Sequence, residues 1–298
     1  MSVNAKDAAA PQSAEAPWLT LMPGLFVVLW STGFIGAKYG LPYASPLIFL
    51  ALRFGIVALL ILLVAIVSRV PWPASWRQVA HDAVVGLLIQ GTYLGGVYFA
   101  VANGISAGLS ALIVSLQPAL TAALAGIILG EEVRPRQWAG VALGFVGVVL
   151  VVWSKLKIQA GQMAGLSTCA VALVGITIGT LYQKRFGGGD LRSATVIQNT
   201  AAFFGLMLIA PWVETIRVEW RLEMVLALVW LILIVSIGAL SLFLVLLRRG
   251  GASRITSLLY LVPPVTALMA YFLFGETFGA TALAGMVLTA AGVALVNR

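Results

Sequence analysis

The residues SLQPALTAALAGIILGEEVRPRQWAGVALGFVGVVLVVW at positions 115–153 decide the fold of this chain, because most of them recur at 260–298 as YLVPPVTALMAYFLFGETFGATALAGMVLTAAGVALVNR. The two stretches align without a gap at an offset of 145 residues, with 14 identities over 39 positions. This offset is close to half of the 298-residue chain. The sequence therefore predicts two tandem copies of one unit, each ending in two apolar segments joined by a Gly-Glu turn.

The composition is that of a membrane protein. Hydrophobic residues make up 61% of the chain and charged residues 9%, whereas soluble domains are about half apolar and about a quarter charged. Apolar runs of about 20 residues are long enough to cross a bilayer as helices. We therefore predict an all-α integral membrane protein.

Ten apolar segments are candidate transmembrane helices, five in each half of the sequence. An odd number of spans per copy makes the second copy enter the membrane from the opposite side, so we expect two inverted five-helix repeats. Residues 1–17 are read as a disordered cytoplasmic tail, 18–153 as the first repeat and 161–298 as the second. The predicted spans are 18–38, 45–67, 83–102, 107–129, 136–153, 161–182, 194–213, 225–247, 255–275 and 280–297.

The net charge of +8 reports on topology rather than on a nucleic-acid partner, because the basic residues lie in the short gaps between apolar runs. Twelve of the 18 fall on one side of the membrane if the N-terminus is inside and five on the other. The positive-inside rule then places both termini in the cytoplasm. The loops leave no room for a soluble domain, although the segment WVETIRVEWRLE at 212–223 suits a short interfacial helix.

Prolines interrupt the fourth and ninth spans at equivalent positions of the two repeats. Pro118 corresponds to Pro263, and Pro264 follows it. A proline removes a backbone donor and disfavours a straight helix. These residues are either fixed kinks or hinges that line a cavity, and their matched positions favour hinges.

Arg53 is the one basic residue well inside a predicted span, where an unpaired charge is costly. We expect an ion pair between Arg53 and Glu276 that acts as a structural latch, with Glu131 as its counterpart in the other repeat. Binding of a substrate carboxylate by Arg53 is the alternative interpretation.

None of the ten acidic residues lies in the middle of a predicted span, and the single His81 lies at a helix end. A proton-driven pump usually needs a titratable group in its path. Facilitated transport or exchange is therefore the simpler expectation. No residue pattern predicts a metal site, a cofactor or an enzymatic activity, since a membrane enzyme acting on lipid would need clustered His, Asp or Glu.

Uncharged amphipathic side chains are the candidate substrate contacts, and we expect the first, third, fourth, sixth, eighth and ninth helices to enclose their cavity. Aromatic residues near helix ends are usually interfacial anchors, an alternative that applies to Tyr182 and Tyr260. Such a lining suits a neutral or zwitterionic organic solute. The candidates are Trp30, Ser31, Gln90, Tyr93, Tyr98, Gln117, Tyr182, Ser241 and Tyr260.

The LWS segment of the first span, the FLALRF segment of the second and the twice-occurring pattern of proline, threonine and Gly-Glu resemble the EamA-type drug/metabolite transporters. The resemblance covers residues 18–298. It implies a ten-helix carrier of two inverted repeats, commonly an inner-membrane exporter of metabolites. Within the family the chain looks most like bacterial exporters of aromatic and other neutral amino acids, of the YddG type.

These observations predict a secondary carrier in the bacterial inner membrane that exports small neutral or zwitterionic metabolites by alternating access. Efflux of cationic drugs is the alternative, and the lack of a buried acid disfavours it, although aromatic faces also bind cations. The expected partners are a small-molecule substrate and the lipid bilayer. The oligomeric state stays open, and a monomer is compatible with the sequence.

Overall fold

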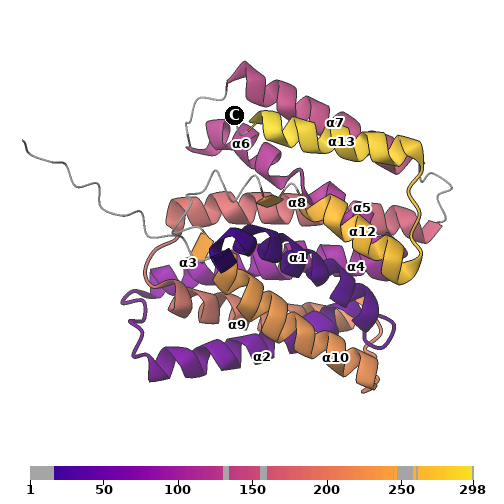
Figure 1. Ribbon diagram of the computed structural model, residues 1–298. Coiled ribbons are helices and arrows are strands. Elements are labelled where there is room, and N and C mark those ends of the chain that lie inside the picture. The colour runs from indigo at the N-terminus through magenta and orange to yellow at the C-terminus, as the bar shows by residue number, and fades with distance from the viewer. Residues whose placement is uncertain are drawn as a thin grey trace, which may run out of the picture.

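The computed structural model describes residues 17–129, 134–154, 160–243, 245–246, 258–259 and 261–296, and these are almost entirely helical (Figure 1). The first half contains α1 (Pro17–Gly40), α2 (Pro46–Val67), α3 (Trp76–Gly86), η1 (Leu87–Leu94), α4 (Gly95–Ala102), α5 (Ala107–Val114), α6 (Gln117–Leu129) and α7 (Pro135–Ser154). The second half contains α8 (Ala160–Phe186), α9 (Leu191–Val213), α10 (Leu222–Trp230), η2 (Leu231–Ala239), α12 (Val262–Phe274) and α13 (Ala280–Val296). The two elements labelled η are π-helices.

The expected all-α membrane architecture is confirmed. Eight helical stretches among the described residues are long and apolar enough to cross a bilayer, and two shorter apolar helices, Val262–Phe274 and Ala280–Leu295, complete the ten segments. The third span begins at Trp76 rather than at residue 83, because Ser75 caps it by accepting a hydrogen bond from the backbone N–H of Gln78.

The two repeats run in opposite directions, as the packing of α7 against α13 shows directly. These equivalent helices lie side by side at one edge of the molecule, next to α6 (Figure 1). A Cβ atom on Gly147 would lie 2.5 Å from the carbonyl oxygen of Gly285, while Gly144 lies against Gly292. From the Gly144–Gly292 contact to the Gly147–Gly285 contact, the residue number rises in α7 and falls in α13, so the helices are antiparallel. Their small residues allow this close approach.

The equivalent pair α2 and α9 is also antiparallel. The loop before α2 pairs with the loop after α9. The backbone N–H of Ser45 donates to the carbonyl of Arg217, and Ala44 forms an isolated antiparallel bridge with Val218. The carboxylate of Glu214 accepts the N–H groups of Leu47 and Ile48 at the start of α2. This is a favourable place for a negative charge.

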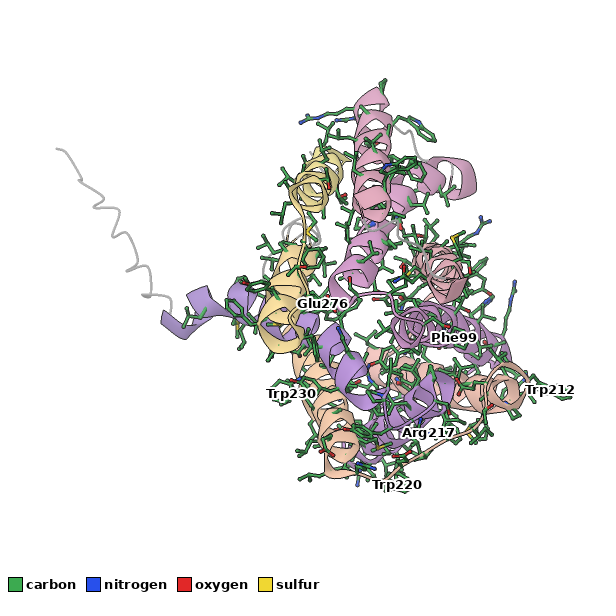
Figure 2. The ribbon with its side chains drawn as sticks, turned by 90° about the vertical axis from the view of Figure 1, so that its right-hand side faces the viewer. Phe99, Trp212, Arg217, Trp220, Trp230 and Glu276 are labelled. Atoms are coloured by element: carbon green, nitrogen blue, oxygen red, sulfur yellow. The ribbon has the colours of Figure 1, made fainter. Side chains whose placement is uncertain are left out.

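The prediction of a short interfacial helix at 212–223 is therefore wrong. Three of the four residues TIRV, at 215–218, are β-branched, and their backbone pairs with the loop before α2 instead. Arg217 lowers the pKa of the Glu219 carboxyl by hydrogen bonding to it. Figure 2 shows Trp212 and Trp220 at the outer edge of the molecule, where both side chains are exposed.

The fourth span is broken into α5 and α6 by a turn at Ser115 and Leu116, directly before Pro118. Pro263 and Pro264 stand in the first turn of α12, the equivalent place in the ninth span. Proline is tolerated at the start of a helix, where its missing N–H has no helical partner to lose. The prolines therefore mark new helix starts rather than kinks within continuous helices, and their role as hinges stays a prediction.

The two π-helices occupy equivalent positions of the repeats. At the offset of 145 residues, the bounds of η1 fall within one residue of those of η2. A π-helix accommodates extra residues in its turns and is frequent at functional sites. Nothing in the apolar sequence of the third and eighth spans predicts these segments.

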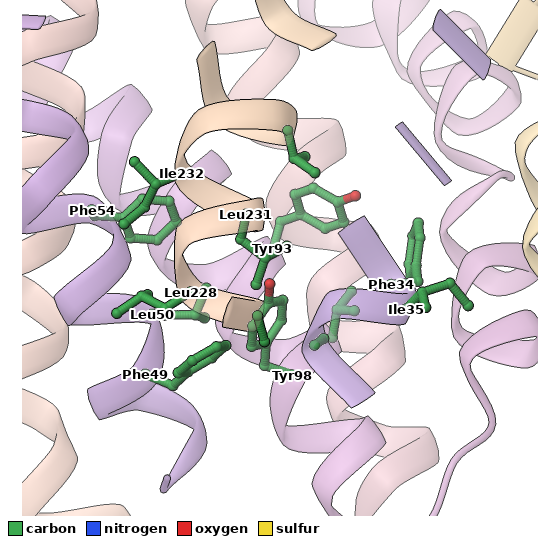
Figure 3. Packing of buried hydrophobic residues seen from close by; sticks show 14 of the residues in the cluster. Phe34, Ile35, Phe49, Leu50, Phe54, Tyr93, Tyr98, Leu228, Leu231 and Ile232 are labelled. Carbon is green, nitrogen blue, oxygen red and sulfur yellow. The ribbon is translucent and has the colours of Figure 1, made fainter. Parts of the chain in front are cut away.

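The largest core cluster packs around η2 and fixes the helices that surround the site. Figure 3 shows Leu231 and Ile232 of η2 against Phe49 and Phe54 of α2, with Tyr93 and Tyr98 beside them. Phe49 and Leu231 are fully buried. The third and eighth spans are thus held against α2.

Candidate functional site

A cavity of about 480 Å³, its open mouth included, lies between the two repeats. Residues of α1, η1, α5, α6, α8 and α12 line it, which are the first, third, fourth, sixth and ninth spans. The eighth span, also expected there, contributes no lining residue. The cavity is lined by Trp30, Phe34, Tyr93, Ala111, Val114, Ser115, Gln117, Pro118, Ile176, Leu259, Val262 and Pro263.

Aromatic side chains make up one wall. The ring of Trp30 lies 5.3 Å from that of Phe26 and 6.0 Å from that of Phe243, measured between centroids, and all three pairs in this cluster are tilted. Phe243 belongs to the eighth span, which therefore supports the wall from behind. Phe34 and Tyr93 extend the aromatic surface. Such surfaces bind flat apolar side chains and also organic cations.

The polar groups of the cavity come from the broken helices. Gln117 donates its amide N–H groups toward the hydroxyl oxygens of Thr121, at 3.1 Å, and Thr180, at 3.4 Å. Its amide oxygen remains as an acceptor. Pro118 and Pro263 cannot donate to the carbonyls four residues earlier, those of Val114 and Leu259, and both of these residues line the cavity. The lining also holds the hydroxyls of Ser115 and Tyr93 and the indole N–H of Trp30, so it offers both donors and acceptors.

Five of the predicted residues are brought together at the cavity wall, namely Trp30, Tyr93, Gln117, Pro118 and Pro263. The apolar members of the lining, such as Val114 and Leu259, were not predicted, because an apolar residue in an apolar span gives no signal of its direction. The signal that could have found these two is their position four residues before the prolines.

Three predicted residues of the first and third spans point elsewhere. Ser31 is fully buried, and its hydroxyl lies 2.7 Å from the carbonyl oxygen of Val27 and 3.3 Å from that of Val262, between α1 and α12. Tyr98 is buried against α2. Gln90, in η1, does not line the cavity, and its amide oxygen is buried without a hydrogen-bond partner.

The remaining predicted residues lie outside the cavity or outside the described part of the chain. Tyr182 hydrogen-bonds His81 at 2.7 Å near the start of the third span, and His81 also stacks on Phe186. Ser241 and Pro264 have exposed side chains. Tyr260 and Glu131 are not among the described residues.

The expected ion pair between Arg53 and Glu276 is wrong. Arg53 is 5% exposed, and its guanidinium donates from Nε to the hydroxyl of Ser236 and from Nη1 to the hydroxyl of Tyr98, both at 3.0 Å. Glu276 is bound elsewhere because α12 packs against α1 and α5, not against α2. The lone hydroxyl within the apolar run LILIVSIGAL is the signal that could have identified Ser236.

Glu276 forms its ion pair with Lys38 at the end of α1 (Figure 2). Gly275 ends α12 with φ of 65°, a left-handed conformation that glycine adopts without strain, and so turns the chain back toward α1. The backbone N–H of Ala107, at the start of α5, lies 3.4 Å from the same carboxylate. The Gly-Glu turn therefore joins the first, fourth and ninth spans at one end of the molecule.

The family is identified by comparison with known proteins. The model of the EamA-like transporter family matches residues 18–153 and again 163–298. This chain belongs to the EamA-like transporter family. The chain is 27% identical over 281 residues to a protein of Salmonella typhimurium described as a probable amino-acid metabolite efflux pump, covering 90% of this chain and 91% of that protein.

Other relatives agree with this assignment. A protein of Escherichia coli with the same description is 26% identical over the same shares of both chains, and the uncharacterized transporter YvbV of Bacillus subtilis is 26% identical over 93% of this chain and 90% of its own. One crystal structure superposes with a TM-score of 0.64 at 19% identity, covering 93% of this EamA-like chain and 95% of that one. This last likeness concerns the fold alone.

Proposed function

We propose that this EamA-like transporter is a secondary carrier that exports small neutral or zwitterionic metabolites, chiefly aromatic and other neutral amino acids. The observation that carries the proposal is the cavity between the repeats, lined by Trp30, Tyr93 and Gln117 and by no charged side chain of the described residues. An aromatic wall suits an apolar side chain, and a few polar groups suit a small polar head. Two relatives described as probable amino-acid metabolite efflux pumps support the same substrate class.

We assign the mechanism as alternating access in the bacterial inner membrane, with both termini in the cytoplasm. The cavity lies where equivalent broken helices of inverted repeats meet, which is the usual place of a carrier's substrate site. The Lys38–Glu276 pair joins the ends of α1 and α12 at one end of the molecule, and we expect it to close the path there. Solute then enters from the other end.

Counterflow into proteoliposomes tests the proposal. Vesicles loaded with unlabelled phenylalanine should take up labelled phenylalanine faster than empty vesicles, and leucine should compete with it. Saturation of this exchange distinguishes a carrier from an open pore. If no neutral amino acid exchanges or competes, the substrate class is wrong.

Efflux of cationic drugs is the second candidate, because aromatic faces such as those of Trp30 and Phe34 bind organic cations. The positive charge of Arg53 disfavours it. A labelled aromatic quaternary ammonium ion belongs in the same counterflow assay. Exchange of this cation in the absence of amino-acid exchange would select the second candidate.

A further inference from the structure

Arg53 carries a buried positive charge that no described acid neutralises. It is 5% exposed, and both of its hydrogen-bond partners, Ser236 and Tyr98, are uncharged. Glu214, at the end of α9, accepts from the backbone of Leu47 and Ile48, which lie five or more residues before Arg53 and so about 8 Å away along α2 at ~1.5 Å per residue. The ion pairs among the described residues are Lys38–Glu276, Arg192–Asp190, Arg217–Glu219 and Arg221–Glu219.

The guanidinium is also incompletely bonded. A guanidinium offers five N–H donors, and the two hydroxyl acceptors use only two of them. Burying a charge without an oppositely charged partner is costly. A planar group with free parallel N–H donors binds a carboxylate in bidentate fashion.

The charge lies one side chain behind the cavity wall. Tyr93, which lines the cavity, belongs to the same buried cluster as Tyr98, the hydrogen-bond partner of Arg53. Figure 3 shows the hydroxyl of Tyr98, the acceptor of the Arg53 bond, pointing toward Tyr93 on the same span. The other partner, Ser236, stands in η2, the π-helix equivalent to the one that holds Tyr93. One π-helix thus binds the guanidinium, and the other contributes Tyr93 to the buried cluster around Tyr98.

The polarity of the cavity matches that of a zwitterion. Its polar side chain on the broken fourth span, Gln117, has an amide oxygen that suits an ammonium group. The cation lies behind Tyr93 of the third span. An amino acid placed between them would have an oppositely charged or polar partner at each end.

We propose that Arg53 binds the carboxylate of the transported substrate. This inference rests on the proposed function and assigns the substrate class of the same cavity, solutes that carry a carboxylate. Movement of the Tyr93 ring brings the guanidinium and the carboxylate together. Ser236 and Tyr98 hold the guanidinium in position in the empty carrier.

The test compares a substrate with its own amide. In proteoliposomes, R53Q should lower counterflow of phenylalanine about tenfold or more, because a charge-assisted bond is lost, and should leave counterflow of phenylalaninamide within twofold of the unmodified protein. R53K should restore part of the phenylalanine rate. A purely structural tie between α2, the third span and η2 predicts equal losses for both solutes, and that result would overturn the proposal.

Two further measurements test the proposal even if R53Q folds poorly. Y98F removes one tie of the guanidinium but keeps its charge, so phenylalanine exchange should fall less than threefold; a loss as large as that of R53Q contradicts the proposal. In detergent, phenylacetate should raise the melting temperature of the unmodified protein and phenylacetamide should not. Equal shifts contradict carboxylate binding.

Failures of the two proposals are separable. If the unmodified protein exchanges no amino acid, the proposed function fails, while the phenylacetate comparison, repeated with R53Q, still tests whether Arg53 binds a carboxylate. If amino acids exchange but R53Q lowers the counterflow of phenylalanine and phenylalaninamide equally, the carboxylate site is wrong and the proposal of a carrier remains.

Discussion

Glu276 shows how one turn residue selects the partner of a charge. The left-handed Gly275 directs the chain toward α1, and the carboxylate there meets Lys38, whose ammonium also lies 4.4 Å from the centroid of the Phe274 ring. The Glu276 side chain is only 9% exposed, so the surrounding water screens the pair little. Charge and spacing along the sequence suggest a partner for Glu276, but only the packing of α12 shows which cation is within reach.

Replacing Glu276 by glutamine should lower the free energy of unfolding by about 2 kcal/mol, the usual value of a charge-assisted hydrogen bond. The amide still accepts a bond from Ala107, so the loss reports on the charge. Thermal unfolding in detergent measures it. E219Q is the matched control, since Glu219 pairs with Arg217 at an exposed site, and its melting temperature should not change. Equal melting temperatures for both variants would contradict this role of the pair.

Trp30 is the residue on which aromatic specificity should depend. W30A removes the ring from the cavity wall and its contacts with Phe26 and Phe243. The phenylalanine concentration that half-saturates counterflow should therefore rise about tenfold, and the half-saturating concentration of alanine should change less. Counterflow at increasing substrate concentration measures both. W212A deletes an 87% exposed tryptophan and should leave both constants unchanged. Equal effects of W30A on the two amino acids would contradict the assignment.

At the scale of the element, the sequence predicts where the helices are interrupted but not which helix faces point into the cavity. The prolines at equivalent repeat positions indicate where the fourth and ninth spans begin anew, because proline chemistry is local. The direction of a side chain depends on the neighbouring helix, so Ser31 and Tyr98 were expected in the cavity but lie against other spans. The π-helices depend on tertiary packing and leave no mark on an apolar sequence.

The α7–α13 pair requires glycine at its crossing. A Cβ atom on Gly147 would overlap the hydroxyl of Thr289 and the carbonyl of Gly285, so G147V should destabilise the protein by about 1–3 kcal/mol. No atom lies within 4 Å of a Cβ atom at Gly24, so G24A in α1 should leave the melting temperature unchanged or slightly raised. Thermal unfolding of both variants checks the prediction. If the two were equally stable, close packing at the crossing would not matter.

Deleting one residue should be tolerated in η2 and not in α10. A π-helix has more residues per turn than an α-helix, so removal of Leu233 lets the segment relax toward α-helix without rotating its flanks. Removal of Leu226 from α10 rotates the flanking positions by about 100°. Both side chains are about half exposed. The Leu233 deletion should yield folded, monodisperse protein whose counterflow is lowered tenfold or more. The Leu226 deletion should yield aggregate. Equal yields of monodisperse protein from the two deletions would contradict the prediction.

At the scale of the whole molecule, the repeat was readable from sequence because it is long and free of gaps. The number of spans follows from apolar length, and the inverted relation follows from five spans per copy, now seen in the antiparallel α7–α13 and α2–α9 pairs. The cavity between the copies also follows from this symmetry. The position of Arg53 relative to that cavity does not, since it depends on how the two copies dock.

The orientation in the membrane is the last prediction and follows from charge. Twelve of the 18 basic residues lie on the side of the N-terminus, so this side should be cytoplasmic. Gly188 and Trp220 flank the single span α9 and are both exposed. An impermeant maleimide should label W220C in intact cells and G188C only after lysis, and the buried native Cys169 should add little background. Labelling of G188C alone in intact cells would reverse the orientation and the direction of export. Labelling of both from one side would contradict the single crossing by α9 on which the inverted repeat depends.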